Sequence, residues 1–303
     1  MYLSKKMGIY LVFLSFTLGV IAPVKGWGQV QKSCPGGALL KLSAVSVSQG
    51  SLVLVQARVP QQTSEVQAEW DGQVAPLWRE AERSGTWHGL LGVDLEKPPG
   101  RYEWTVTWRG AEGAETGCSV FLTVRAGRFA TEHLQVGKKF VEPDPEQLKR
   151  AQADQEKMRA IYAAVTPERF WEGPFRLPLK EAAPGGNFGR RRVLNGEARS
   201  PHSGVDFPAA EGTPVYAAQR GKVVLAEELY YSGNTVVIDH GYGIYTLYAH
   251  LSELEVRPGQ PVKPSEEIGK VGATGRVTGP HLHWGLTVEH ARVNALDIVS
   301  RQP

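Results

Sequence analysis

The stretch GPHLHWGL (residues 279–286) decides the fold and the chemistry of the C-terminal half of this chain. Apolar residues alternate with two histidines, a pattern that is typical of a β-strand. Successive side chains of a strand point to opposite faces, so His281 and His283 emerge on one face, ~7 Å apart along the backbone. Leu282 then points into a core. Two imidazoles on one strand face can both reach one metal ion.

Two more polar clusters precede this strand in the sequence. The first, HSGVD, contains His202 and Asp206. Because Gly204 and Pro208 disfavour a helix, we expect an extended segment, in which this even spacing also places both side chains on one side. The second cluster, YAHL, contributes His250. Each cluster alone is common among ordinary hydrogen-bonded histidines, but the three together, bounded by glycines, indicate a functional site.

The residue types in these clusters favour a catalytic metal site. Catalytic zinc sites use three protein ligands and leave a fourth position for water. His202 and Asp206 with either His281 or His283 make such a set, and imidazole suits zinc better than calcium or magnesium. The spacing leaves the choice between the two histidines open. A hydrolase also needs a proton acceptor and donors to a developing oxyanion. The remaining member of the pair and His250 are available for those roles.

The N-terminus is predicted to direct export. Lys5 and Lys6 precede an apolar run over residues 7–24, and Gly26 is a small residue suited to cleavage. We therefore predict that residues 1–26 are a signal peptide, with a membrane anchor as the alternative. The protein is expected in the periplasm or cell envelope, or outside the cell, and attached to the inner membrane if the signal is retained.

Length and charge limit the other function classes. A chain of 303 residues is long enough for two domains and their connections. The net charge of +3 is spread along the chain, so we expect no nucleic-acid partner. The sequence does not indicate an oligomeric state.

Residues 27–127 are predicted to form a β-sandwich, because short β-rich runs alternate with Gly, Pro and Asp turn signals. The expected strands are 39–47, 51–59, 66–70, 86–93, 102–109 and 119–125. Four tryptophans are expected in its core, with an aromatic carbohydrate-binding face as the alternative: Trp70, Trp87, Trp104 and Trp108. Cys34 and Cys118 lie near the two ends of this segment, and an exported protein permits a disulfide between them. The alternative is two separate buried thiols.

Residues 128–173 are predicted to be a linker that contains one helix, Glu146–Val165. Asp144 is the expected N-cap and Pro145 suits the first helical position. An apolar stripe at helical spacing predicts a helix packed against one or both domains; a lid over the site is the alternative. Its members are Leu148, Met158, Ile161, Tyr162 and Val165.

Residues 174–303 are predicted to form a second, compact and antiparallel all-β domain without a long helix. The expected strands are 214–217, 222–226, 235–239, 244–249, 268–271 and 281–288. His240 begins the turn HGYG, which indicates a hairpin. We interpret His240 as structural and expect His290 in a loop beyond the site.

Three stretches of this region resemble the lysostaphin-like zinc metallopeptidases, which cut peptide bonds in bacterial peptidoglycan. They occur in the family's order, within residues 187–298: NFGRRRVLNGEARSPHSGVDFPAAEGTPV, NTVVIDHGYGIYTLYAHLS and GATGRVTGPHLHWGL. The leading β-domain is similar to the immunoglobulin-like module that precedes such domains in some exported members.

The resemblance implies a role for each polar residue of the three clusters. His202, Asp206 and His283 look like the ligands of one zinc ion. His281 looks like the general base, and His250 looks like a second catalytic histidine that stabilises the oxyanion or handles a proton. The expected fold is a compact antiparallel β-domain with the metal in a groove.

Two further residues and the substrate are also implied by the resemblance. Tyr248 matches a family tyrosine that supports the site or lines the substrate groove, and Asn187 is expected to line that groove. The loop over residues 193–200 fits the members that cut directly crosslinked peptidoglycan, so the expected bonds are D-alanyl–meso-diaminopimelate crosslinks. The alternatives are a non-catalytic, peptidoglycan-binding activator of a cell-wall amidase and a metalloprotease that cuts glycine-rich peptides.

Overall fold

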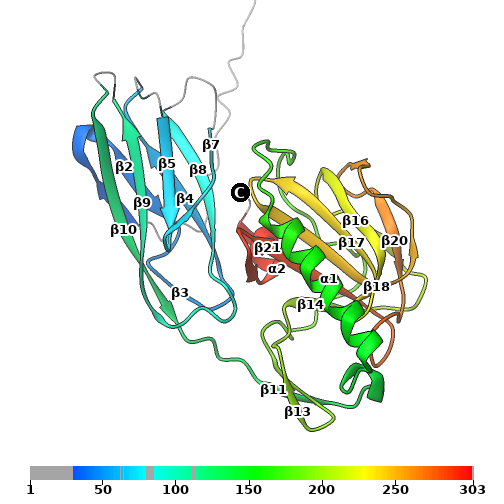
Figure 1. Ribbon diagram of the computed structural model, residues 1–303. Helices are drawn as coiled ribbons and strands as arrows, with labels where there is room; N and C mark the ends of the chain where they lie inside the picture. Colours follow the sequence, from blue (N-terminus) through cyan, green and yellow to red (C-terminus); the bar gives the residue numbers. More distant parts are fainter. Residues whose placement is uncertain (1–29, 62, 64, 80–84, 111–112, 302–303) are drawn as a thin grey trace, which may run out of the picture.

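The computed structural model describes residues 30–61, 63, 65–79, 85–110 and 113–301. Within them, a two-sheet sandwich is followed by a connecting segment with one long helix and by a second β unit (Figure 1). The predicted all-β class is confirmed. The predicted export signal lies outside the described residues. No helix in the described part of the chain is both long and apolar enough to cross a membrane.

The sandwich consists of two five-stranded sheets in the described residues. The first contains, in spatial order, β1 (Val30–Ser33), β2 (Leu39–Leu42), β4 (Leu52–Arg58), β8 (Thr86–Gly92) and β7 (Leu77–Arg79). The second contains β3 (Ser46–Ser48), β10 (Glu115–Arg125), β9 (Gly100–Arg109), β5 (Glu65–Trp70) and β6 (Gln73–Val74). A 3-10 turn, η1 (Pro35–Gly37), follows β1. A disulfide joins Cys34 to Cys118, as expected, and so links the β1–β2 connection to β10.

One sequence prediction for the sandwich is wrong, and a second holds for three of its four residues. The run Leu39–Val47 is not one strand, because the chain leaves the first sheet after β2 and enters the second as β3. The chain leaves the first sheet at Ser43, whose hydroxyl accepts a hydrogen bond from the Leu54 N–H at 3.0 Å. Of the four tryptophans, Trp87 is only partly buried, whereas the other three are 6% exposed or less. Burial of those three supports the core-packing interpretation.

The connecting segment contributes a strand, a short turn and a helix. Its elements are β11 (Thr131–Leu134), η2 (Lys138–Phe140) and α1 (Pro145–Ala163). Strand β11, which the sequence did not predict, pairs in parallel with β12 (Arg191–Leu194), and β12 pairs with β13 (Glu197–Arg199). Figure 1 shows this small sheet below the second β unit.

Helix α1 begins at the expected N-cap. The Asp144 carboxylate accepts from the Gln147 N–H at 2.8 Å, and the Gln147 side chain accepts from the Asp144 N–H at 3.2 Å, which is a capping box. Met158 and Tyr162 pack onto the second β unit, whereas Leu148 is 45% exposed. The helix therefore lies against the outer face of that unit, as the spacer interpretation predicts.

The second β unit is a nine-stranded sheet in the described residues. Its main path is β14 (Gly204–Pro208), β21 (His281–Val288), β18 (Ile244–Leu254), β17 (Gly233–Gly241), β16 (Gly221–Leu229) and β19 (Pro261–Val262). The other strands are β15 (Pro214–Tyr216), β20 (Glu267–Val271) and β22 (Ala291–Val293). A short helix that the sequence did not predict ends the unit: α2 (Ala295–Arg301).

The predicted hairpin joins β17 to β18. Tyr242 and Gly243 both have positive φ, 50° and 74°, which matches the right-handed twist of the flanking strands. His240 is fully buried beside this turn, and its two ring nitrogens lie 2.8 Å from the Arg220 carbonyl and 2.7 Å from the Thr246 hydroxyl. This placement agrees with a structural histidine.

The interior of the sandwich is a hydrophobic cluster of its own, and a second cluster crosses the junction between the two units, where Leu52, Leu54, Trp78 and Leu90 of the first sheet pack with the core of the second β unit. Trp78 from β7 meets Trp171 edge-on, with 5.1 Å between ring centroids. Asp94 accepts two hydrogen bonds from the Arg292 guanidinium, at 2.7 and 3.0 Å. Asp297 accepts the Leu52 N–H at 2.9 Å. Apolar burial and a bidentate ion pair therefore hold the two units together.

Candidate metal centre

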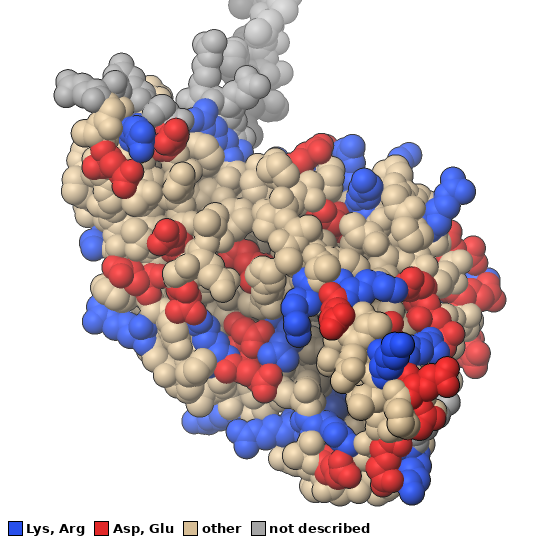
Figure 2. Space-filling model, in the orientation of Figure 1, with Lys and Arg blue, Asp and Glu red and all other residues tan. Residues whose placement is uncertain are grey.

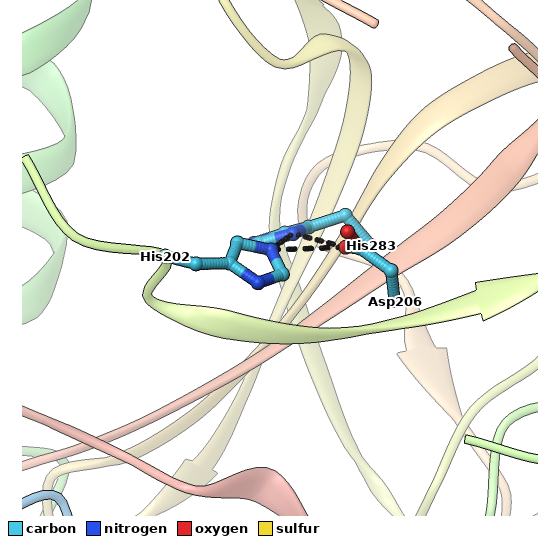
Figure 3. A group of neighbouring side chains, drawn as sticks. All are labelled: His202, Asp206 and His283. Atoms are coloured by element: carbon cyan, nitrogen blue, oxygen red, sulfur yellow. Dashed lines mark hydrogen bonds and ion pairs between the residues drawn. The ribbon is translucent and has the colours of Figure 1, made fainter. Parts of the chain in front are cut away.

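The pairing of β14 with β21 brings two of the predicted residues together. Asp206 lies directly opposite His283 in this antiparallel register, so both side chains emerge on the same face. His202, on the extended segment before β14, reaches the same point. The Asp206 Oδ1 atom lies 2.9 Å from His283 Nδ1 and 3.0 Å from His202 Nε2, and the two nitrogens are 2.9 Å apart (Figure 3).

The opposite face of these strands is core. Val205, Leu282 and Trp284 are at most 1% exposed. The alternation predicted for residues 279–286 is therefore confirmed: Leu282 points inward while His281 and His283 point to the site.

Tyr248 lies on the core face, away from the three clustered side chains. It pairs with Trp284 across β18 and β21, so it shares the face of Trp284 and not that of His283. Tyr248 is fully buried, and its hydroxyl accepts a hydrogen bond from the Ala218 N–H at 2.8 Å. Tyr248 therefore does not line the pocket beside the cluster; of the two roles expected for it, support of the site stays a prediction.

His250 reaches the site because the backbone of β18 is distorted there. Regular alternation would put His250 on the same face as Tyr248. Instead His250 has φ 66°, a left-handed conformation that costs free energy for a residue with a Cβ atom. Its ring centroid lies 4.9 Å from that of His281 and 5.8 Å from that of His283. The distortion turns the imidazole toward the site.

The two histidines outside the cluster of three are held in matching ways. Nδ1 of His281 lies 2.8 Å from the Gly279 carbonyl oxygen, and Nδ1 of His250 lies 2.9 Å from the Thr274 carbonyl oxygen. A carbonyl oxygen can only accept, so each Nδ1 carries the hydrogen. In the neutral rings, each Nε2 therefore presents a lone pair. His281 Nε2 lies 3.8 Å from Asp206 Oδ1.

Asn187 supports the cluster as well as lining the pocket beside it. Its side-chain amide donates to Asp206 Oδ2 at 2.7 Å, and its side-chain oxygen accepts the Asp206 N–H at 3.1 Å. Its carbonyl oxygen lies 3.0 Å from His202 Nδ1. It thus fixes the carboxylate and leaves Nε2 of His202 free to face the cluster.

The electrostatics of the cluster suit a cation. Burial alone would raise the pKa of Asp206, but the close ring nitrogens and the charges of His202 and His283 hold that pKa well below its usual value. Burial lowers the pKa of His283, and it lowers the pKa of His250 to about 3. At neutral pH Asp206 is thus ionised and burial favours the neutral form of His283, which are the protonation states that metal ligands require.

The distances between the possible ligand atoms fit a metal ion. One carboxylate oxygen and two imidazole nitrogens, from Asp206, His202 and His283, lie within 4.8 Å of one another. A tetrahedral zinc site with ~2.0–2.1 Å bonds to nitrogen separates its ligand atoms by ~3.3 Å. The observed separations of 2.9–3.0 Å are close to this value.

A pocket opens beside the cluster, and several of its residues were not predicted. Asp206, His250 and His281 line one side, and the small β11–β13 sheet and the loop before β21 supply the rest. Arg192 and Arg276 also line this pocket. A signal for Arg192 was present in the sequence, where three arginines stand in a row at residues 190–192.

Comparison with known proteins agrees with this geometry. Residues 200–295 match the model of peptidase family M23. The peptidoglycan DD-endopeptidase ShyA of Vibrio cholerae is 48% identical over 111 residues, which are 36% of this chain and 26% of ShyA. The DD-carboxypeptidase/endopeptidase Mpg of Neisseria meningitidis is 41% identical over 102 residues, which are 34% of this chain and 24% of Mpg. The chain thus spans about a quarter of the length of these relatives.

One solved structure resembles the chain over nearly its whole length. A putative peptidase M23 from Pseudomonas aeruginosa is 28% identical, with a TM-score of 0.65. The alignment covers 84% of this chain and 95% of that protein. The similarity therefore extends beyond residues 200–295 to the elements that precede them.

Proposed function

We propose that this chain, whose residues 200–295 form a peptidase family M23 domain, is a zinc metalloendopeptidase that hydrolyses peptide crosslinks of bacterial peptidoglycan. The observation that carries the proposal is the convergence of His202, Asp206 and His283, with His250 and His281 beside them. The finer proposal, cleavage of D-alanyl–meso-diaminopimelate bonds, rests on the peptidoglycan DD-endopeptidases that resemble residues of this domain.

The proposed metal ion binds to the cluster of His202, Asp206 and His283. We assign His202 Nε2, His283 Nδ1 and an oxygen of Asp206 as the zinc ligands. Zinc supplies Lewis-acid chemistry when bound: it polarises the substrate carbonyl and lowers the pKa of the attacking water. His and Asp in a 2:1 ratio are an established ligand set for catalytic zinc.

His281 acts as the general base in this proposal. Its Nδ1–H is engaged by the Gly279 carbonyl, so Nε2 faces the pocket with a free lone pair. Nε2 accepts the proton of the attacking water, and the resulting imidazolium donates a proton to the leaving amine. The Gly279 contact also fixes the ring, which keeps Nε2 aimed at the reacting atoms.

His250 handles a proton in this proposal. Its Nδ1–H donates to the Thr274 carbonyl and its pKa is lowered to about 3 by burial, so the free protein presents a bare Nε2. A bare nitrogen cannot donate to an oxyanion. Oxyanion stabilisation therefore requires prior protonation of the ring. Proton handling begins with Nε2 accepting a hydrogen bond from the attacking water, because a ring with a pKa of about 3 is too weak a base to hold the proton in the free protein.

Two substitutions separate these roles. We expect His283→Ala to lose both zinc and turnover, because a ligand is removed. His281→Ala should retain zinc but lose turnover by about 100-fold or more, the contribution of one positioned base. Zinc content by mass spectrometry and cleavage of a crosslinked muropeptide measure the two effects. Equal loss of zinc in both variants would contradict this division of roles.

The site of action in this proposal is the cell envelope. Lys5 and Lys6 before the apolar run support export, with residues 1–26 as a signal peptide or anchor. The Cys34–Cys118 disulfide suits an oxidising compartment such as the periplasm. Fractionation of cells that express the tagged chain, with and without residues 1–26, tests this part.

A further inference from the structure

The pocket beside the metal-ligand cluster contains more positive charge than the proposed mechanism uses. Arg192, from β12, and Arg276, from the loop before β21, line the same pocket as His250 and His281. Figure 2 shows blue Lys and Arg atoms around a hollow in the lower half of the molecule, where Figure 1 draws β11 and β13. Neither guanidinium touches a proposed reacting atom, so neither takes part in the proposed proton transfers.

Arg276 has no acidic partner among the residues that the structure describes. Its guanidinium carbon lies 4.5 Å from the centroid of the Tyr231 ring, and its backbone N–H donates to the Tyr231 carbonyl at 2.8 Å. Tyr231 therefore holds the side chain in place without neutralising it. Burial and the nearby charge of Arg192 lower the pKa of Arg276. A positioned, half-buried cation with unused donors is a site for an anion.

Arg192 is also incompletely paired. Its Nη2 atom lies 3.8 Å from Asp206 Oδ2, but that oxygen already accepts a hydrogen bond from Asn187 at 2.7 Å. Nε of Arg192 is buried without a hydrogen-bond partner. Glu132 also lines the pocket, and its carboxylate lies 3.5 Å from Arg190 Nη1. The Glu132 charge also acts on Arg192, but no hydrogen bond joins these two side chains in the described part of the chain. Since Asp206 is committed to the metal-ligand cluster, guanidinium donors of Arg192 and Arg276 remain available in the pocket.

We propose that Arg276, together with Arg192, binds a free carboxylate of the peptide substrate close to the scissile bond. The inference rests on the proposed function and adds a specificity to it: the preferred crosslinked peptide carries a carboxylate where these arginines reach, and not a carboxamide. Guanidinium groups bind carboxylates with two parallel hydrogen bonds, which fixes orientation as well as charge. Such a contact aligns the scissile carbonyl with the catalytic histidines.

The test compares two synthetic crosslinked muropeptides that differ only in this group, carboxylate or carboxamide. We expect the zinc-loaded protein to cleave the carboxylate form with a kcat/KM about 10- to 100-fold higher, the usual value of one charged hydrogen-bonded contact. Arg276→Gln should lose this preference by slowing only on the carboxylate peptide. Arg276→Lys should keep part of the preference for the carboxylate peptide. The positive charge remains, but the planar guanidinium that makes two parallel hydrogen bonds is lost. Arg257→Gln, on an exposed turn away from the pocket, should keep the full preference.

Three results would overturn the inference. Equal cleavage of both peptides by the original protein would remove the specificity while leaving the endopeptidase proposal intact. A full preference in Arg276→Gln, with zinc content and thermal unfolding unchanged, would assign the specificity to another residue. Cleavage of neither peptide would refute the proposed function itself, and this inference with it.

Discussion

Asn187 should control how tightly the site holds its metal ion. Its side-chain amide donates to Asp206 Oδ2 at 2.7 Å and its side-chain oxygen accepts the Asp206 N–H at 3.1 Å. Asn187→Ala removes both bonds but keeps the backbone carbonyl that contacts His202. After the substitution, the Asp206 carboxylate is free to rotate. Fixing this carboxylate when it binds zinc then costs conformational entropy.

The magnitude follows from the charged hydrogen bond. A hydrogen bond to an ionised group contributes about 1.5–3 kcal/mol. Since about 1.4 kcal/mol is a factor of ten, we expect zinc affinity to fall about 10- to 100-fold, which is also the usual effect of losing a residue that supports a metal ligand. Asn187→Asp should be at least as damaging, because it places a second carboxylate against Asp206.

Zinc affinity is measured by competition with a chelator of known affinity at pH 7.5. Asn195→Ala is the matched control: its side chain also makes two hydrogen bonds with one backbone segment, to Val136 at 2.9 and 3.0 Å, but contacts none of the proposed ligands. We expect wild-type zinc affinity in this control. Unchanged affinity in Asn187→Ala would refute the supporting role and show that Asp206 is held by its strand alone.

Three further predictions concern the rest of the molecule. Reducing the Cys34–Cys118 disulfide, which closes a separation of 84 residues, should lower the free energy of unfolding by about 4–5 kcal/mol in urea titrations followed by tryptophan fluorescence; overlapping curves with and without reductant would contradict this. Burial lowers the pKa of His240 from 6.5 to about 4, so the unfolded chain binds the extra proton first as pH falls. The stability difference between the original protein and His240→Gln should therefore shrink by about 3 kcal/mol from pH 7 to pH 4, and a pH-independent difference would count against a buried neutral ring. Gly204→Ala would place a Cβ atom 2.6 Å from Nε2 of His283 and 2.7 Å from the Trp284 carbonyl, so we expect zinc loss in a folded protein; retained zinc would show that the ring can shift without cost.

The β-strand that contains the paired histidines was predictable because its information is local. Alternation alone placed His281 and His283 on one face and Leu282 in the core, and the even spacing of His202 and Asp206 placed both on one side of an extended segment. The same rule fails at His250. Tyr248 and His250 are also two residues apart, yet they face opposite sides, since the positive φ of His250 interrupts the alternation.

The pocket walls could not be predicted in the same way. Strand β11 pairs in parallel with β12, almost sixty residues further along the chain. Both strands are short, and neither has a sequence pattern that would predict this pairing. Arg192 and Arg276 become neighbours through this long-range pairing and through the path of the loop before β21. Helix α2 was missed because seven residues are too few to show a clear helical period.

Digestion of purified peptidoglycan sacculi tests the central claim most directly. The zinc-loaded chain is incubated with sacculi, with and without a chelator, and the fragments are identified by mass spectrometry. The proposal predicts that crosslinked dimers disappear and monomeric stem peptides with a newly freed amine accumulate, and that chelator or His283→Ala abolishes this. An unchanged fragment pattern from folded, zinc-loaded protein would contradict the assignment of His202, Asp206 and His283 as a peptidase metal centre.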